Sequence, residues 1–196
     1  MPVMSRIEAA FCRSRPWRAF TGSEVLPWSL QGFEPHGDIL EIGAGSGAMA
    51  AELLARYDDP TITVTDFDQE MVDAASVRLA PFGDRVTVRQ ADATALPFPD
   101  ESFDAALSWV MLHHTVEWEK ALAECVRVLR PGGHVTGYDL LAAAPLRLLH
   151  RRDGDHLRMM RVDELRTVVR DLPVDQAILT PGLAGLVVRF LLRKRP

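Results

Sequence analysis

Ten consecutive residues, Asp38-Ile-Leu-Glu-Ile-Gly-Ala-Gly-Ser-Gly47, set the architecture of this chain. The first five, Asp38–Ile42, have the pattern of a short buried β-strand, and a helical pattern begins at Ala48 and runs to Tyr57. Glycines between a strand and a helix allow a tight turn, let a ligand approach the backbone closely and leave the free amides of the helix start facing that ligand. The stretch therefore predicts a strand, a ligand-binding loop and a helix.

The rest of the chain repeats this alternation of strand and helix patterns. We predict further strands over residues 61–65, 85–90, 103–109, 135–140, 174–180 and 186–192, and helices over 69–80, 116–129 and 163–171. Asp68 is the expected N-cap of the helix that follows it, and Pro131, Gly132 and Gly133 are expected to end the helix before them. The short connection at 181–185 predicts an antiparallel hairpin. The sequence thus predicts an α/β, Rossmann-like, seven-stranded and mostly parallel sheet with an antiparallel last strand and helices on both faces.

Composition narrows the class of protein. The chain has 196 residues, 47% of them hydrophobic and 25% charged, with a net charge of −5, which is typical of one globular domain. Residues 141–196 carry 11 basic and 6 acidic side chains, but the basic ones are not interleaved with aromatic ones, so we expect no nucleic-acid binding. No apolar run is long enough to span a membrane, and the first residues lack the apolar core of a secretory signal, so we predict a cytoplasmic protein.

The two cysteines, Cys12 and Cys125, lie in different predicted helices without CxxC spacing or a neighbouring histidine cluster. We therefore expect neither a disulfide nor a metal site, and interpret both as small buried side chains.

The glycine loop alone leaves two ligand classes open. Gly43, Gly45 and Ala48 also satisfy the dinucleotide fingerprint, so a nicotinamide-dependent oxidoreductase is an alternative. Glu41, however, lies close to where a pyrophosphate would sit, and like charges there are costly, whereas a cationic ligand would be favoured. A reductase would also need a catalytic pair such as Tyr-x-x-x-Lys, and neither tyrosine of the chain is followed by lysine at that spacing.

Two more acids follow strands of the predicted sheet. Asp66 ends the second strand, where a carboxylate can accept both hydroxyl groups of a ribose. Asp92 follows the third strand and could accept from an exocyclic amine such as adenine N6, although a solvated loop residue or a cap is an equally good interpretation. Together the acids favour a cationic nucleoside as the ligand.

A set of motifs in this order resembles the class I S-adenosylmethionine-dependent methyltransferases. They are Glu41–Gly47, Thr65-Asp66-Phe67-Asp68, Asp92–Phe98, Ser102-Phe103-Asp104 and Leu129-Arg130-Pro131-Gly132-Gly133. The resemblance covers about residues 37–140 and is closest to the small-molecule branch typified by the ubiquinone and menaquinone biosynthesis methyltransferases. Any one motif is weak, whereas the set is specific.

The resemblance implies S-adenosyl-L-methionine as the cofactor. It implies that the glycine loop packs against the methionine part, that Asp66 binds the ribose, and that Asp92 and Ala93 hold the adenine. By the same analogy Glu41 helps to neutralise the ammonium group, and Ser108 lies near the methionine part. The cofactor-binding residues expected in this way are Glu41, Gly43, Ala44, Gly45, Gly47, Asp66, Phe67, Asp92, Ala93 and Ser108.

The expected reaction is methyl transfer to a small-molecule acceptor by in-line displacement. The cofactor is itself a strong electrophile, so the protein mainly has to orient the acceptor and exclude water. His113 and His114 follow the fourth strand, and Tyr138 and Asp139 end the fifth, at the edge where ligands of open α/β sheets bind. All four are placed to face the acceptor, and His113, His114 and Tyr138 are the candidate catalytic residues. Either histidine is a candidate general base, with a structural or pocket-wall role as the alternative. A non-catalytic cofactor-binding or partner-binding protein on the same fold is the alternative function.

Two segments are candidates to cover the site. Residues 1–36 contain five aromatic side chains of Phe and Trp, and we predict a helical N-terminal segment that closes over an apolar acceptor, with plain packing against the sheet edge as the alternative. The loop from Ala142 to Arg161 is the second candidate. Residues 37–196 are then the methyltransferase domain.

Overall fold

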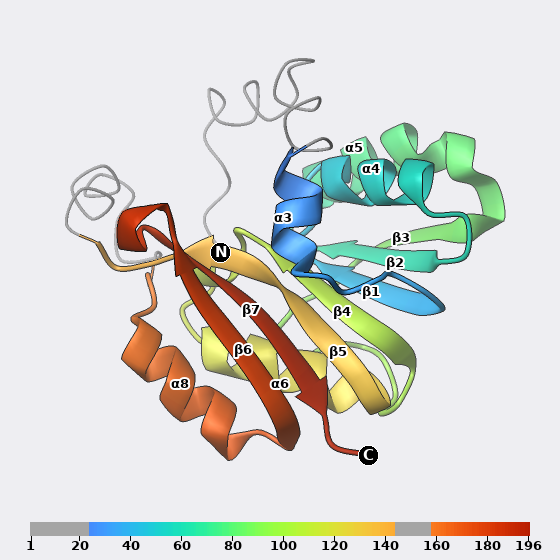
Figure 1. Ribbon diagram of the computed structural model, residues 1–196. Coiled ribbons are helices and arrows are strands. Elements are labelled where there is room, and N and C mark those ends of the chain that lie inside the picture. Colours follow the sequence, from blue (N-terminus) through green and yellow to red (C-terminus); the bar gives the residue numbers. More distant parts are fainter. Residues whose placement is uncertain (1–23, 144–157) are drawn as a thin grey trace.

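The computed structural model describes residues 24–143 and 158–196 (Figure 1). The strands are β1 (Asp38–Ile42), β2 (Thr61–Asp66), β3 (Val86–Gln90), β4 (Phe103–Trp109), β5 (Leu129–Leu140), β6 (Val174–Gly182) and β7 (Val187–Lys194). The α-helices are α3 (Leu26–Leu30), α4 (Ala48–Arg56), α5 (Gln69–Leu79), α6 (Trp118–Val128) and α8 (Val162–Asp171). Short 3-10 turns are η2 (Ala80–Arg85), η3 (Leu112–His114) and η6 (Leu183–Gly185).

All seven strands form one sheet in the order β3-β2-β1-β4-β5-β7-β6. The strands from β3 to β5 are parallel neighbours, and β7 pairs antiparallel with both β5 and β6. The predicted mixed sheet with its C-terminal hairpin is therefore confirmed. Because the parallel strands all point the same way, the loops after β1, β2, β3 and β4 gather at one edge of the sheet.

Helices cover both faces of the sheet (Figure 1). On one face α3, α4 and α5 pack over a core that includes Ile39 and Leu107. On the other face α6 and α8 pack over a core that includes Leu40 and Ala106. Neighbouring residues of β1 and β4 thus bury their side chains in opposite cores, as the two-residue period of a strand requires, and burial on both faces explains why these strands are apolar throughout.

Local signals explain where the helices begin and how they pack. The carboxylate of Asp68 accepts a hydrogen bond from the Glu70 amide at 2.9 Å, which confirms Asp68 as the N-cap of α5. In α6 the apolar residues at helical spacing are buried, including Trp118 and Cys125. Burial raises the pKa of the Cys125 thiol to about 12, so this cysteine packs as a small apolar side chain, as predicted.

The start of β5 differs from the prediction, which placed a stop at Pro131-Gly132-Gly133 and a strand only from Val135. In the structure α6 ends at Val128 and β5 begins at once with Leu129. The register of β4 against β5 shifts here, because Phe103 pairs with Leu129 whereas Ala105 pairs with His134. Proline and glycine therefore form a bulge inside a strand, and not a loop before it.

The segment predicted to cover the site lies partly outside the described residues. Cys12 and most of the N-terminal aromatic side chains fall in residues 1–23, and much of the 142–161 loop falls in residues 144–157. Within the described ranges α3 packs on the sheet, with Leu26 fully buried and Leu30 3% exposed. None of the helices in these ranges is long and apolar enough to cross a membrane.

Candidate functional site

The glycine loop after β1 is packed at one end and open in the middle. Gly43 and Gly45 have φ angles of +56° and +55°, in the left-handed region that favours glycine. A Cβ atom at Gly43 would lie 1.9 Å from Cγ of Met111, whereas a Cβ atom at Gly45 would have nothing within 4 Å. Gly43 thus lets the loop pack on Met111, and Gly45 faces open space that a ligand can use.

Asp66, at the end of β2, is bonded to this loop. Its Oδ2 accepts from the Gly45 amide at 2.8 Å, and its Oδ1 accepts from the Asp68 amide at 2.9 Å. Burial raises the pKa of this half-buried carboxyl group, and the two amide hydrogen bonds offset part of that effect. Each carboxylate oxygen has further lone pairs, so Asp66 can accept from hydroxyl groups of a ligand while it holds the loop.

Glu41 lies in the sheet just before the loop and is 1% exposed. Its Oε2 atom has no hydrogen-bond partner among the described residues. Burial, and then the nearby charge of Asp66, raise the pKa of Glu41 to about 8. A buried carboxyl group without a partner is costly, and a cation placed beside it would compensate both the lost hydrogen bond and the charge.

The loop after β3 brings the third predicted acid to the same edge. The Ala91 amide donates to the backbone carbonyl of Asp66 at 3.0 Å, which ties this loop to the end of β2. Asp92 is exposed, and its Oδ1 accepts from both the amide and the hydroxyl of Thr94 at 2.8 Å. Ala93 is 7% exposed and Phe67 is 44% exposed. Asp92 is therefore a turn-forming residue that stays exposed at this edge.

Ser108 lies between the neighbouring strands at the end of β4. It pairs in register with Ile42 of β1 and with Gly137 of β5. The side chain is buried, and its Oγ atom has no hydrogen-bond partner within the described part of the chain. Glu41 and Ser108 thus each contribute a buried polar atom without a partner next to the glycine loop.

The two predicted histidines have different surroundings. His113 is 1% exposed, and its Nδ1 lies 2.6 Å from Oδ1 of the fully buried Asp139. The other oxygen of Asp139 accepts from the Leu112 amide at 2.6 Å. Asp139, expected to face the acceptor, is instead turned into the protein, where it holds η3 in place. His114 is half-buried, with its ring centroid 4.0 Å from that of His113.

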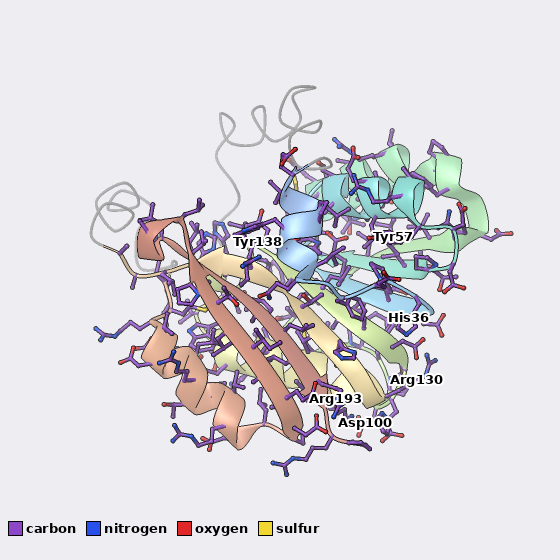
Figure 2. The ribbon with its side chains drawn as sticks, viewed as in Figure 1. His36, Tyr57, Asp100, Arg130, Tyr138 and Arg193 are labelled. Carbon is purple, nitrogen blue, oxygen red and sulfur yellow. The ribbon has the colours of Figure 1, made fainter. Side chains whose placement is uncertain are left out.

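Tyr138, the remaining predicted catalytic candidate, belongs to an aromatic cluster next to α3 (Figure 2). Its ring centroid lies 5.3 Å from that of Trp28 in α3 and 6.1 Å from that of Trp109 at the end of β4. The Arg189 guanidinium lies over the Trp28 ring at 4.7 Å and donates to its carbonyl at 2.8 Å. Tyr138 is half-buried, so the cluster forms a wall that continues from the end of β4 toward β7.

The structure therefore brings Glu41, the glycine loop, Asp66 and the end of β4 together at one sheet edge. Sequence reasoning missed Met111, which packs under Gly43, and it placed Trp28 in the covering segment without the edge-to-face contact that Trp28 makes with Tyr138. No spacing signal marks either contact, because each joins segments that are distant in sequence. The tight approach of Gly137 to Ser108, whose carbonyl oxygen would lie 1.9 Å from an added Cβ, has a visible signal in the glycine inside an apolar strand.

Comparison with known proteins agrees with this geometry. Residues 40–136 match the methyltransferase domain family. A demethylmenaquinone methyltransferase of Clavibacter sepedonicus is 39% identical over 119 residues, which cover 61% of this chain and 45% of that protein. A ubiquinone/menaquinone biosynthesis C-methyltransferase of Geotalea daltonii is 32% identical over 129 residues, covering 64% of this chain and 52% of that protein. The chain thus spans about half the length of the curated relatives it matches.

Solved structures share the fold at lower identity. A SAM-dependent methyltransferase of Thermotoga maritima superposes with a TM-score of 0.73 at 20% identity, covering 97% of each chain. The YcgJ protein of Bacillus subtilis gives a TM-score of 0.73 at 21% identity, covering 91% of this chain and 99% of that one. The similarity in fold covers the whole sheet, and so extends beyond residues 40–136, which match the domain family. Residues 40–136 thus match the methyltransferase domain family, and the chain has the motifs and the fold of the class I S-adenosylmethionine-dependent methyltransferases.

Proposed function

We propose that this protein transfers a methyl group from S-adenosylmethionine to a small-molecule acceptor. The family supplies the cofactor and the reaction type, and the relatives above, named for menaquinone and ubiquinone biosynthesis, support an acceptor of small size. Since the chain spans only about half of those relatives, the acceptor itself is left to experiment. The cytoplasmic location and the exclusion of nucleic acid stay predictions.

The observation that carries the proposal is the buried Oε2 atom of Glu41, which has no hydrogen-bond partner among the residues that the structure describes. This buried acid lies directly before a loop that opens at Gly45. A ligand with a positive charge would remove the cost of this arrangement, whereas a pyrophosphate would increase it. The residues present therefore fit S-adenosylmethionine better than a nicotinamide dinucleotide, which argues against the oxidoreductase alternative.

The chain's residues then have separate roles in binding. We assign the ammonium end to Glu41, the ribose hydroxyls to Asp66 and the adenine amine to Asp92. Gly43, Ala44, Gly45 and Gly47 provide the cradle, with Phe67, Ala93 and Ser108 lining it. When bound, S-adenosylmethionine supplies a methyl group on a positively charged sulfur that a nucleophile can displace directly.

The chain's contribution to the chemistry is to orient the acceptor and to remove water from it. We assign the acceptor side to the wall formed by Tyr138, Trp28 and Trp109, since aromatic side chains bury apolar ligands and their polar atoms can orient them. Of the two histidines, His114 is the more accessible, so we propose that it contacts the acceptor, and that His113, held by Asp139, positions the turn.

Cofactor binding tests the assignment. Calorimetry should show S-adenosylmethionine binding that Asp66→Ala weakens about tenfold to a hundredfold, because a charge-assisted hydrogen bond is worth about 1.5–3 kcal/mol. Asp58→Ala, which removes an exposed carboxylate in the turn before β2, is the matched control and should leave the affinity unchanged. Asp66→Asn keeps an oxygen that can accept from the Gly45 amide, and separates loss of the ligand contact from collapse of the loop. Unchanged binding by Asp66→Ala would refute the assignment.

Activity tests the rest of the proposal and separates it from the non-catalytic alternative. Purified protein incubated with S-adenosylmethionine labelled in the methyl group and with a metabolite extract should transfer the label to a small molecule. Cofactor binding without transfer to any component would favour a non-catalytic cofactor-binding protein on this fold.

A further inference from the structure

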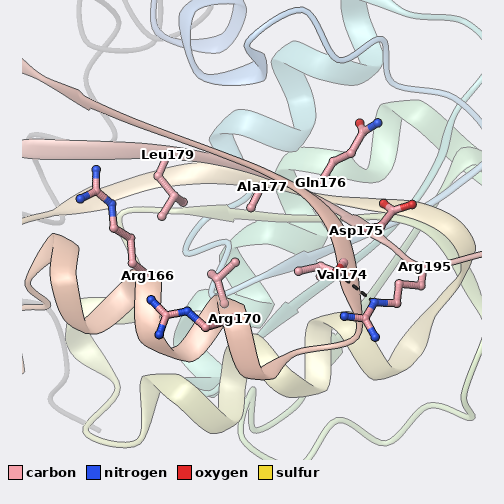
Figure 3. Close-up of a pocket in the computed structure, with 9 residues that line it drawn as sticks. Arg166, Arg170, Val174, Asp175, Gln176, Ala177, Leu179 and Arg195 are labelled. Atoms are coloured by element: carbon pink, nitrogen blue, oxygen red, sulfur yellow. Dashed lines mark hydrogen bonds between the residues drawn. The ribbon is translucent and has the colours of Figure 1, made fainter.

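A cavity of about 480 Å³ lies between α8 and β6, on the sheet edge farthest from β3 (Figure 3). One wall comes from α8, through Arg166, Val169 and Arg170, and the other from β6, through residues 174–177 and Leu179. Three other strands separate β6 from β1, so this groove is distinct from the site at the glycine loop.

The groove is positively charged. Arg166 and Arg170 are four residues apart on α8, so they lie on one face of the helix, and Arg195 completes the lining. All three are exposed, and none forms an ion pair with any residue of the described ranges. The one acid in the lining, Asp175, already pairs through both oxygens with Arg193, at 2.9 and 2.7 Å. Arg166 and Arg170 therefore present their charge to the groove, whereas Arg195 donates to the Val174 carbonyl at 3.2 Å and its charge also acts on Asp175.

The second wall is the open edge of the sheet. β6 pairs with β7 on one side and, within the described ranges, with no strand on the other. A register shift between Val174 and Gln176 interrupts one end of this edge, and Pro181, which has no amide hydrogen, lies near the other. Residues 176–180 between them present backbone groups to which an extended chain can add.

The floor of the groove is apolar. Val169 of α8 is 4% exposed, and Leu179 of β6 packs on the same core. Side chains of an added strand would point alternately toward α8 and away from it. An occupant that fits must therefore be extended, with small apolar groups for the floor and negative charges for the arginines.

We propose that this groove binds an acidic segment of a partner protein in extended conformation, which adds to β6 as an eighth strand. Its backbone pairs with residues 176–180, and every second side chain faces α8. Of these facing side chains, the carboxylates pair with Arg166 and Arg170, and a small apolar side chain between them contacts Val169 and Leu179. The charge and the free strand edge together favour a peptide over a nucleic acid, whose recognition would add aromatic stacking surfaces that this lining lacks. The proposal does not depend on the methyl transfer proposed above.

The test uses a capped, fluorescein-labelled peptide, Glu-Thr-Val-Thr-Glu-Thr, whose two Glu and one Val side chains share one face, and the full chain, with fluorescence anisotropy as the readout. We expect saturable binding that weakens about tenfold in the double variant Arg166→Gln/Arg170→Gln and also weakens as salt is raised. The matched control is Arg56→Gln/Lys120→Gln, which removes two positive charges from exposed residues of α4 and α6 and should change affinity less than twofold. Thermal unfolding should be nearly unchanged in both, because the substituted side chains are exposed.

Two further probes separate strand addition from simple charge attraction. The same peptide with N-methyl groups on alternate residues cannot pair along one backbone edge, and we expect it to bind at least tenfold more weakly. Equal binding of the methylated peptide, equal loss in the control variant, or no binding of the peptide would each overturn the proposal. Binding of a twelve-nucleotide single-stranded DNA that depends on Arg166 and Arg170, where the peptide fails, would overturn it in favour of nucleic acid.

Discussion

Glu41 carries a carboxyl group that the fold buries and whose pKa it raises to about 8. In the unfolded chain the same group ionises near its ordinary pKa of 4.5. Folding therefore keeps a proton on Glu41 at neutral pH, and a bound cation would favour its release. This residue links protonation, stability and ligand binding in one side chain.

Stability against pH tests this link. Below about pH 4.5 the group is protonated in both states; as pH rises toward 8 only the unfolded chain ionises it, so the free energy of unfolding falls by about 1.4 kcal/mol per pH unit from this group. Glu41→Gln cannot ionise. We expect urea unfolding of Glu41→Gln, compared with the native protein, to show a stability advantage that grows by about 3 kcal/mol between pH 5 and pH 7.5. An advantage that is constant across this range would contradict the assignment.

The two histidines allow a matched comparison at neighbouring positions. His113→Phe removes the ring nitrogen that pairs with buried Asp139 and leaves that carboxylate short of a donor, so we expect a loss of about 2–4 kcal/mol in urea unfolding. His114→Phe keeps the pair intact and should retain stability while lowering the rate of methyl transfer. A stable His113→Phe, or a fully active His114→Phe, would contradict the roles assigned here.

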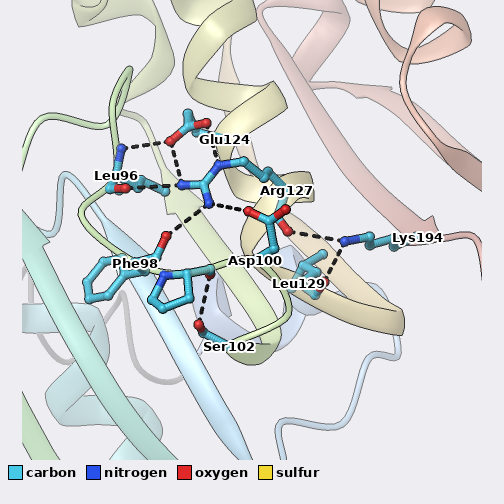
Figure 4. A network of polar contacts seen from close by, with 9 residues as sticks. Leu96, Phe98, Asp100, Ser102, Glu124, Arg127, Leu129 and Lys194 are labelled. Atoms are coloured by element: carbon cyan, nitrogen blue, oxygen red, sulfur yellow. Dashed lines mark hydrogen bonds and ion pairs between the residues drawn. The ribbon is translucent and has the colours of Figure 1, made fainter.

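The loop between β3 and β4 is fixed by two side chains of α6, Arg127 and Glu124, and Oε2 of Glu124 accepts from the Leu96 amide at 2.8 Å (Figure 4). Arg127 donates to the carbonyls of Leu96 and Phe98 at 3.0 and 2.9 Å. It also pairs with both oxygens of Glu124, at 2.7 and 2.8 Å, and with Asp100 at 2.7 Å. These contacts hold the pKa of Arg127 above its usual range and of Glu124 below it. Helix α6 thus determines where the loop that carries Asp92 lies.

Replacement of Arg127 tests this dependence. Arg127→Met keeps much of the side-chain length but removes every donor, so we expect a loss of about 1–3 kcal/mol of stability and weaker S-adenosylmethionine binding. Arg161→Met, which removes an exposed arginine that pairs with nearby Asp163, is the control and should leave both nearly unchanged. Thermal unfolding and calorimetry measure the two effects. Loss of stability without weaker binding would show that the loop does not need this anchor to bind the cofactor.

Across the whole molecule, strong local patterns were predictive and long-range contacts were not. The buried strands β1 and β4 have the bounds that the sequence predicts, because continuous apolar runs between turn signals leave little choice. The bulge in β5 was missed because proline and glycine signal an interruption without telling whether the strand resumes around it.

The site shows the same division. The acids and glycines gather at one edge because the parallel topology requires it, whereas the pairing of His113 with Asp139 joins residues 26 apart in sequence and has no local signal. The packing of Met111 under Gly43 is of the same kind. Such contacts form only when segments that are far apart in the sequence pack together, and no local pattern in either segment reveals its partner.

The predicted N-terminal cover of the site can be tested by deleting the residues that precede α3. The buried side chains of α3, Leu26 and Leu30, belong to the core, so a deletion must leave this helix in place. We expect a variant lacking residues 1–23 to unfold at a similar temperature and to bind S-adenosylmethionine within about twofold, with methyl transfer abolished. Loss of cofactor binding together with activity would contradict a role confined to the acceptor.

The position of β7 has a consequence for how the protein is made. This strand is translated after all the others, yet it lies between β5 and β6. While the nascent chain leaves the ribosome, β6 emerges with no partner, and the flank of β5 stays exposed until β7 inserts beside it. The part of the sheet from β3 to β5 can form earlier. Unpaired strand edges are therefore exposed during one interval of synthesis, and we expect chaperone binding to be greatest just before residues 187–194 emerge.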